Sequence, residues 1–141
     1  MLRPISSGVF ASVLLAAVLA ASGPAFTQES KANCADPQTQ MEMTQCAGED
    51  YDKADKELNT QYRKLRAILV ERDKAADDHS KGAEEALIAA QSAWIVFRDA
   101  NCDFEGFQAR AGTMEPQPVL SCLAAMSRAR TNDLRKWTES F

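Results

Sequence analysis

Seven polar, aromatic and sulfur-containing side chains recur at helical spacing in two segments of this sequence. Asp55, Asn59 and Tyr62 lie in the first segment, and Gln91, Trp94, Arg98 and Cys102 lie in the second. Residues three or four apart share one face of a helix, so each set predicts a polar stripe on an otherwise apolar face. Carboxylate, guanidinium, amide and indole groups brought together in this way could hold a buried charge or contact a ligand.

The charged members of these stripes are expected to meet between helices. If the helices pack as a bundle, Asp55 lies near Arg98, and a third helix brings Arg128 or Arg130 to the same level. Such a partly buried network is either a binding site or a device that sets the register of three amphipathic helices.

Aromatic residues at the same helical spacing are expected to belong to the core. Tyr51, Trp94 and Phe97 follow the period of the apolar stripes, which favours burial over a ligand cage.

Residues suited to catalysis are scarce. His79 is the single histidine and lies in a polar turn, so it offers neither a zinc site nor a catalytic triad. Asp50, Asp52 and Asp55 resemble a calcium loop, but they lack its glycine and continue a helical pattern. No glycine loop for phosphate follows a strand pattern. The sequence therefore predicts a protein that is not an enzyme, with no catalytic residues, cofactor or metal.

Length and charge limit the number of domains and the kinds of partner that this protein can have. The 141 residues carry 16 Lys and Arg against 20 Asp and Glu, which gives a net charge of −4. This length is typical of one domain. Nucleic-acid binding needs clustered basic residues, and the acidic balance argues against it.

The first 25 residues have the layout of a signal peptide. Arg3 precedes an apolar run from Val9 to Ala21, and Gly23 and Ala25 are small residues suited to a peptidase site. Cleavage is expected after Ala25, with Gly23 as the alternative. A retained membrane anchor is the other interpretation, but charges on both sides of the run are missing. We expect an exported protein, periplasmic or secreted, without a stable membrane anchor. Removal of Arg3 with the signal peptide would add one unit of net negative charge.

The rest of the chain is predicted to form a short tether followed by helices. Residues 26–37 form a short tether with a helix-start signal at Asp36 and Pro37, and residues 38–141 form the helical domain. Apolar spacings of three and four predict a helix over about 38–74, an antiparallel second helix over about 83–107, and a shorter third after residue 118. The expected fold is an all-α bundle.

Four cysteines fit disulfides in an exported protein. Cys34, Cys46, Cys102 and Cys122 would gather at one end of the bundle, because the first helix starts there, the second ends there and the third starts there. Three pairings are possible, and the sequence does not choose among them. The absence of a Cys-x-x-Cys pair favours a structural over a redox role.

The second segment also carries a resemblance. The pattern Gln-x-x-Trp-x-x-x-Arg-x-x-x-Cys from Gln91 to Cys102 closely resembles the lysozyme-inhibitor LprI-like family, and the likeness extends from about Cys34 to Trp137. The resemblance implies a small exported helical domain with cysteine bridges, inhibition of lysozyme for the naming member, and no catalytic residues. That member looks like a lipoprotein, whereas this chain has no cysteine at the end of the signal peptide.

These observations together favour an exported, non-enzymatic protein that binds a cationic lysozyme-type enzyme. Acidic side chains from Glu49, Asp50, Asp52 or the turn at 73–78 would then face the positive cleft of the partner. The alternative is an envelope structural or stress-related interaction module with another partner. The oligomeric state stays open.

Overall fold

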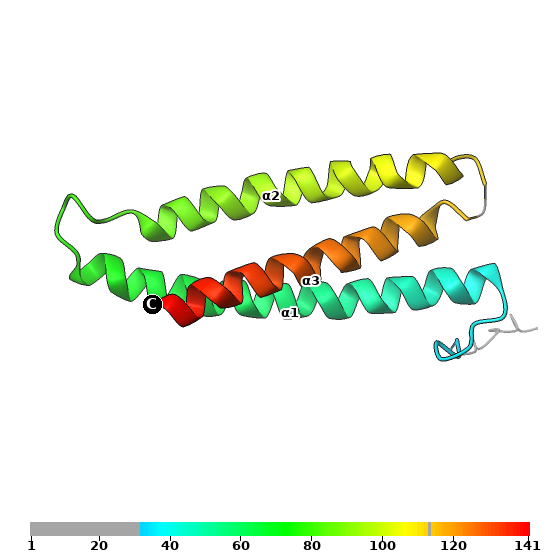
Figure 1. Cartoon of the computed structure of the whole chain (residues 1–141), viewed down its shortest axis with the longest axis horizontal. Helices are drawn as coiled ribbons and strands as arrows, with labels where there is room; N and C mark the ends of the chain where they lie inside the picture. Colours follow the sequence, from blue (N-terminus) through cyan, green and yellow to red (C-terminus); the bar gives the residue numbers. More distant parts are fainter. Residues whose placement is uncertain (1–31, 113) are drawn as a thin grey trace, which may run out of the picture. The chain divides into compact units, whose positions relative to one another are not determined.

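The described part of the chain consists of three long α-helices (Figure 1). The structure, a computed structural model, describes residues 32–112 and 114–141. The helices are α1 (Gln40–Ala75), α2 (Ala83–Gly106) and α3 (Pro116–Ser140), and a short 3-10 turn, Phe107–Ala109, follows α2. The predicted all-α fold is confirmed. The predicted signal peptide and residues 26–31 of the predicted tether lie outside the described residues.

The helices of this unit alternate in direction along the chain. α1 and α3 run the same way, and α2 runs opposite to both (Figure 1). The main partner of α1 is α3, whereas α1 and α2 have few contacts with each other. The second helix is antiparallel to the first, as expected, but the first helix packs mainly on the third. The reason is that the buried leucines of α1 pack on α3, around Leu134.

The third helix is longer than expected. It has 25 residues against 24 in α2, so it is not shorter than the second helix. It begins at Pro116, and the sequence reading had placed Pro116 and Pro118 in the preceding connection. Proline is tolerated in the first turn of a helix, because the amide hydrogen it lacks has no partner there.

The start of α1 is set by a capping box. The Thr39 hydroxyl accepts a hydrogen bond from the Glu42 amide at 3.2 Å, and the Glu42 carboxylate accepts one from the Thr39 amide at 2.9 Å. Hydrogen bonds from the backbone amides of Gln38 and Thr39 lower the pKa of Glu42. The helix therefore starts just after Asp36 and Pro37, the two residues that the sequence predicted as the helix-start signal.

The start of α2 is held by a residue from the end of α1. Gly82 takes a left-handed conformation at φ 108° and has no side chain to cap the helix. The carboxylate of Asp73 accepts hydrogen bonds from the amides of Ala83 at 3.1 Å and Glu84 at 2.9 Å. The hydrogen bond from the Glu84 amide is the main cause that lowers the pKa of Asp73. Asp73 thus joins two helices across their turn.

Replacing Asp73 with alanine is expected to lower the melting temperature at pH 7. Because the folded pKa is lowered, the stabilisation is present above the unfolded pKa of about 4 and is lost as pH falls through the folded pKa. Thermal unfolding followed by circular dichroism from pH 7 to pH 2 measures this. Asp78→Ala, at an exposed residue of the same turn, is the control. A difference between Asp73→Ala and wild type that does not change with pH would contradict the capping role.

The core lies between α1 and α3. Leu58, Leu65, Leu69 and Leu134 form a buried cluster, with Trp94 of α2 packed against it. Burial of these side chains is the main force that holds the helices together.

Two of the three aromatic residues expected in the core are only partly buried. Tyr51 and Trp94 are half-buried, and Phe97 is 59% exposed. The core prediction for Phe97 is wrong, because α2 has a second apolar face that points away from the bundle.

The close approach of α2 to α3 requires a glycine. Gly106 is buried, and a Cβ atom there would overlap the Val119 side chain. Gly48 in α1 has only Leu120 Cδ1 nearby, at 3.9 Å, which is an ordinary contact.

Opposite effects are expected when these two glycines are replaced. Gly106→Ala should lower the free energy of unfolding by about 1–3 kcal/mol through overpacking. Gly48→Ala should raise it by about 0.5–1 kcal/mol, because alanine favours the helix. Urea denaturation of both variants measures the pair. An equal effect of the two changes would show that α2 and α3 are not tightly packed at Gly106.

Candidate functional site

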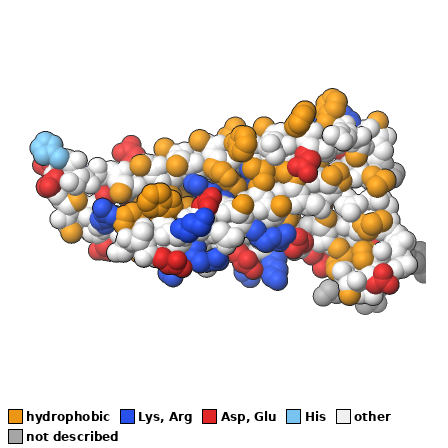
Figure 2. All heavy atoms as spheres, viewed as in Figure 1, with side chains coloured by type: hydrophobic (Ala, Val, Ile, Leu, Met, Phe, Trp, Pro, Cys, Tyr) orange, Lys and Arg blue, Asp and Glu red, His pale blue; other side chains and the backbone are white. Residues whose placement is uncertain are grey.

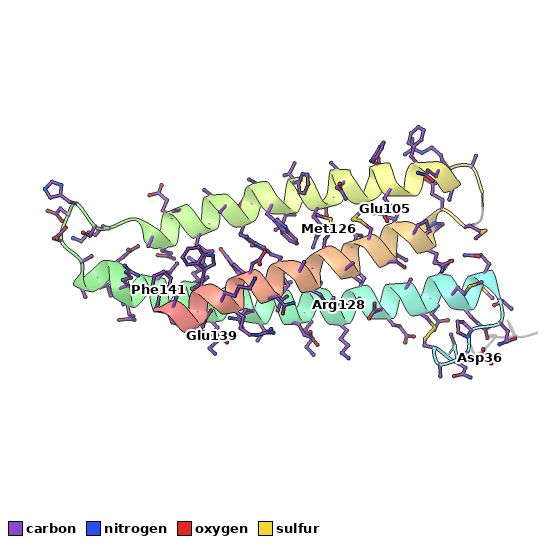
Figure 3. The ribbon with its side chains drawn as sticks, viewed as in Figure 1. Asp36, Glu105, Met126, Arg128, Glu139 and Phe141 are labelled. Carbon is purple, nitrogen blue, oxygen red and sulfur yellow. A yellow bond between two sulfur atoms is a disulfide. The ribbon has the colours of Figure 1, made fainter. Side chains whose placement is uncertain are left out.

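Two disulfides cross-link one end of the bundle. Cys34 bonds to Cys46 with an S–S distance of 1.97 Å, and Cys102 bonds to Cys122 at 1.99 Å. The first joins the tether to α1, and the second joins the end of α2 to the start of α3. The Sδ atom of Met126 lies 3.6 Å from Cys102 Sγ, between α2 and α3 (Figure 3). The structure thus selects one of the three pairings.

Arg98 is the centre of a polar cluster that links all three helices. Its side chain is only 7% exposed. Its Nε donates to Asp99 at 2.8 Å, and its Nη1 donates to Asp55 at 3.2 Å and to the Ser127 hydroxyl at 3.3 Å. Asp55 belongs to α1, Arg98 to α2 and Ser127 to α3. The structure therefore brings Asp55 and Arg98 together.

Aromatic rings complete the surroundings of this guanidinium. It lies 5.3 Å from the Trp94 ring centre and 5.6 Å from that of Tyr51, within cation–π range. Burial lowers the pKa of Arg98, but hydrogen bonds and charges from Asp99, Tyr51 and Asp55 outweigh it and raise the pKa. Burial in turn raises the pKa of Tyr51. Arg98 is thus a permanently charged group held inside the bundle.

Arg130 lies in a separate pair. Its Nε donates to the Gln91 side-chain oxygen at 3.1 Å, and its guanidinium lies 5.8 Å from the centre of the Trp94 ring. Gln91 itself is buried. No ion pair joins Arg130 to Asp55, so the network expected from the sequence is divided into two parts, each with an arginine near the Trp94 ring.

Arg128 takes a different partner. It binds the carboxylate of Asp50 through both terminal nitrogens, at 3.0 and 2.8 Å (Figure 3). Hydrogen bonding from Arg128 lowers the pKa of Asp50. This exposed pair connects α1 with α3 outside the network of Arg98.

The remaining predicted site residues lie beside these groups. Asn59 donates to Asp55 Oδ2 at 2.7 Å and helps to orient that carboxylate. Tyr62 packs against the leucine core. Sequence reasoning missed Ser127, although Ser127, Thr131 and Leu134 follow the helical period and are all buried.

The outer face of α2 is an exposed apolar stripe. It consists of Ala93, Val96, Phe97, Ala100 and Phe104, and Phe107 continues it beyond the helix end. Val96 is 71% exposed and Phe104 is 74% exposed. Figure 2 shows hydrophobic side chains along the edge of the molecule that α2 forms. Contiguous exposed apolar surface of this kind marks an interaction site in many proteins.

Acidic residues flank this outer face. The exposed charged side chains of α2 are Glu85, Asp99, Asp103 and Glu105, and all of them are acidic. Two of these carboxylates are paired with arginines, Asp99 with Arg98 at 2.8 Å and Asp103 with Arg110 at 3.2 Å. A partner surface with apolar and basic side chains would complement such a stripe. Sequence reasoning missed this face, although Phe97 and Phe104 lie seven residues apart and so share one side of the helix.

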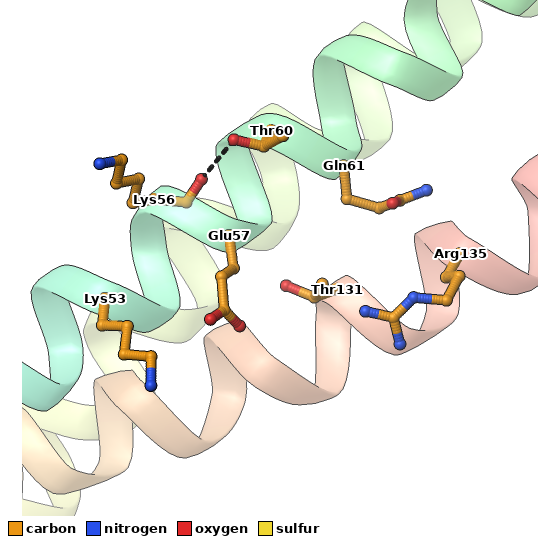
Figure 4. Close-up of a pocket in the computed structure, with 7 residues that line it drawn as sticks. All are labelled: Lys53, Lys56, Glu57, Thr60, Gln61, Thr131 and Arg135. Carbon is orange, nitrogen blue, oxygen red and sulfur yellow. Dashed lines mark hydrogen bonds between the residues drawn. The ribbon is translucent and has the colours of Figure 1, made fainter.

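A shallow polar hollow lies between α1 and α3 (Figure 4). Glu57 of α1 lies near Thr131 of α3, and Gln61 of α1 lies near Arg135 of α3. The Thr60 hydroxyl donates a hydrogen bond to the Lys56 carbonyl at the edge of the hollow. Long, solvated side chains line it, which is typical of ordinary surface. Within residues 32–112 and 114–141 there is no cluster of three His, Cys, Asp or Glu that could hold a metal.

Three helices pack around a buried arginine, one disulfide joins α2 to α3, and a second ties the tether to α1. These features define a small cross-linked helical protein. The family model described as "Lysozyme inhibitor LprI" matches residues 30–134, so the chain belongs to this family. An uncharacterized protein from Rhizobium meliloti (strain 1021) is 41% identical over 133 residues, which covers 92% of this chain and 96% of the relative. No solved structure matches the chain significantly. In the described residues, no helix combines the length and apolar character that crossing a bilayer requires.

Proposed function

We propose that this protein is exported, loses residues 1–25, and inhibits a lysozyme-type enzyme by binding it without acting as an enzyme itself. Family membership supports the inhibitor role. The binding surface is inferred from one observation, the exposed apolar stripe with acidic edges on the outer face of α2.

Of the acidic residues expected to face the partner, several already have other roles. Asp50 is bound by Arg128, and Asp73 caps α2. Glu49 accepts a hydrogen bond from Gln45 beside the first disulfide. Asp99 and Asp103 are also ion-paired, with Arg98 and Arg110, but they lie next to large exposed apolar side chains. These side chains supply the desolvated centre that a stable interface needs. The outer face of α2 is therefore the better contact surface for a cationic enzyme.

Inhibition of muramidase activity by the oxidised mature chain tests the proposal. We expect inhibition by the wild type, and the double variant Phe97→Ser/Phe104→Ser should require at least about tenfold more protein, because buried aromatic residues dominate interfaces. Met41→Ser, at a 77% exposed apolar residue of α1, is the matched control and should inhibit normally. Unchanged lysozyme rates at large molar excess of wild type would overturn the inhibitor role. Normal inhibition by the double variant would overturn the assigned surface.

The same outer face would equally serve an envelope interaction module, the second candidate function. Affinity capture from an envelope extract, with wild type and Phe97→Ser/Phe104→Ser compared side by side, separates the two. A lysozyme-type enzyme captured by the wild type alone supports the inhibitor. An unrelated envelope protein captured through the same face supports the module.

A further inference from the structure

An apolar groove lies at the end of the bundle that is opposite to the disulfides. It has a volume of about 370 Å³, within the range of pockets that hold small molecules. Leu65 and Leu69 of α1, Leu87 of α2 and Leu134 of α3 line it. All three helices contribute residues to it, and α3 ends at this end of the bundle, beside α1 (Figure 1).

Exposed aromatic residues lie at the edge of this groove. Trp137 is 58% exposed and Phe141 is 52% exposed, although both also line the groove. Their rings stack with centres 6.2 Å apart. Phe141 lies at the end of α3 (Figure 3). These half-covered rings leave apolar surface available to a bound molecule.

One charged residue, Arg130, lines the groove. Its Nε is occupied by Gln91, and in the described part of the chain no carboxylate lies within ion-pair distance of its terminal nitrogens. Asp133, one turn further along α3, is 3.3 Å from Lys136 Nζ instead. The contrast with Arg98, which has two carboxylate partners, is clear. A half-buried guanidinium in apolar surroundings is stabilised by an anion.

We propose that this groove binds an amphipathic monoanion, a carboxylate that carries an unbranched apolar chain. The chain packs against the leucines and the exposed ring of Trp137. The carboxylate accepts hydrogen bonds from the terminal nitrogens of Arg130, whose planar fork matches two carboxylate oxygens. A cationic head group would be repelled by Arg130, and this gives the site its specificity. The site is separate from the outer face of α2, so it goes beyond the proposed inhibitor function.

Intrinsic fluorescence reports on this site directly. The chain has two tryptophans, and Trp94 lies against Arg130 while Trp137 lines the groove. Titration of the oxidised mature chain with decanoate, below its micelle concentration, should give a saturable change. Decyltrimethylammonium has an alkyl chain of similar length and the opposite charge, and it should bind at least about tenfold more weakly.

Three variants locate the binding. Arg130→Gln should weaken decanoate binding about tenfold or more, since a charge-assisted hydrogen bond is lost. Arg135→Gln, at an exposed arginine of the polar hollow, should bind decanoate as the wild type does. Ala90→Phe places a ring in the groove from an exposed position and should abolish binding of both probes. Helix content by circular dichroism confirms that each variant is folded.

Three results would overturn the proposal. They are no saturable response to decanoate, equal affinity for the two probes, and unchanged decanoate affinity in folded Arg130→Gln. Normal decanoate binding by Phe97→Ser/Phe104→Ser is also expected, because the groove and the outer face of α2 are different surfaces.

Discussion

Replacement of Arg98 by methionine is expected to lower the free energy of unfolding by about 3 kcal/mol, because it removes one partner of a buried ion pair. The change leaves the hydroxyl of Ser127, which is fully buried, without its donor, and it leaves the Asp55 carboxylate without its cation. The Asp55 side chain is 35% exposed, so hydration of its carboxylate offsets part of the energy lost with the ion pair. Methionine fills similar space, so lost packing contributes little.

Urea denaturation of wild type and Arg98→Met measures this effect. Asp99→Asn is the matched control, since Asp99 also bonds Arg98 but is 56% exposed. Its replacement should cost only about 0.5 kcal/mol, as is usual for an exposed ion pair. A loss below about 1 kcal/mol in Arg98→Met would show that the buried pair adds little to stability, as some buried pairs do.

This buried position favours a structural role for the network. A guanidinium that touches all three helices and is 7% exposed is out of reach of a protein partner. We propose that Arg98 sets the register in which the three helices pack, the second of the two roles considered from the sequence. The surfaces open to partners are the outer face of α2 and the groove beside Arg130.

Removal of the disulfide between α2 and α3 is expected to have an effect of similar size. Cys102→Ala/Cys122→Ala should lower the free energy of unfolding by about 3 kcal/mol, because the bond closes a loop of 20 residues in the unfolded chain. Both cysteines are buried between α2 and α3, so the loop that the bond closes opens only when these helices unfold.

The other disulfide provides the comparison. Cys34→Ala/Cys46→Ala should cost only about 1 kcal/mol, although its loop of 12 residues is not much shorter. Cys34 is exposed and lies in the tether, which can detach locally while the helices stay folded. Thermal and urea unfolding of the two double variants measure the difference. A larger loss from the tether bond would mean that the tether is an integral part of the fold.

Local sequence pattern predicted much of this architecture. Spacings of three and four placed α1 and α2 to within about two residues, because an amphipathic period is a property of each segment alone. The start of α3 was misplaced, because proline was read as a helix breaker where it lies in the first turn. The exposed side of α2 was also misread, because an apolar period does not show whether a residue such as Phe97 faces the core or the solvent.

The sequence by itself determined three helices, short connections that reverse the chain, and four cysteines at one end of the bundle. Only the tertiary structure decided that Cys34 pairs with Cys46, and that α3 is the main partner of α1. It also decided that Asp50 forms an ion pair with Arg128 and that Arg130 lines an apolar groove. The physical reason is that periodicity specifies which residues share a face of one helix, whereas the rotation of each helix against its neighbours depends on packing between distant segments.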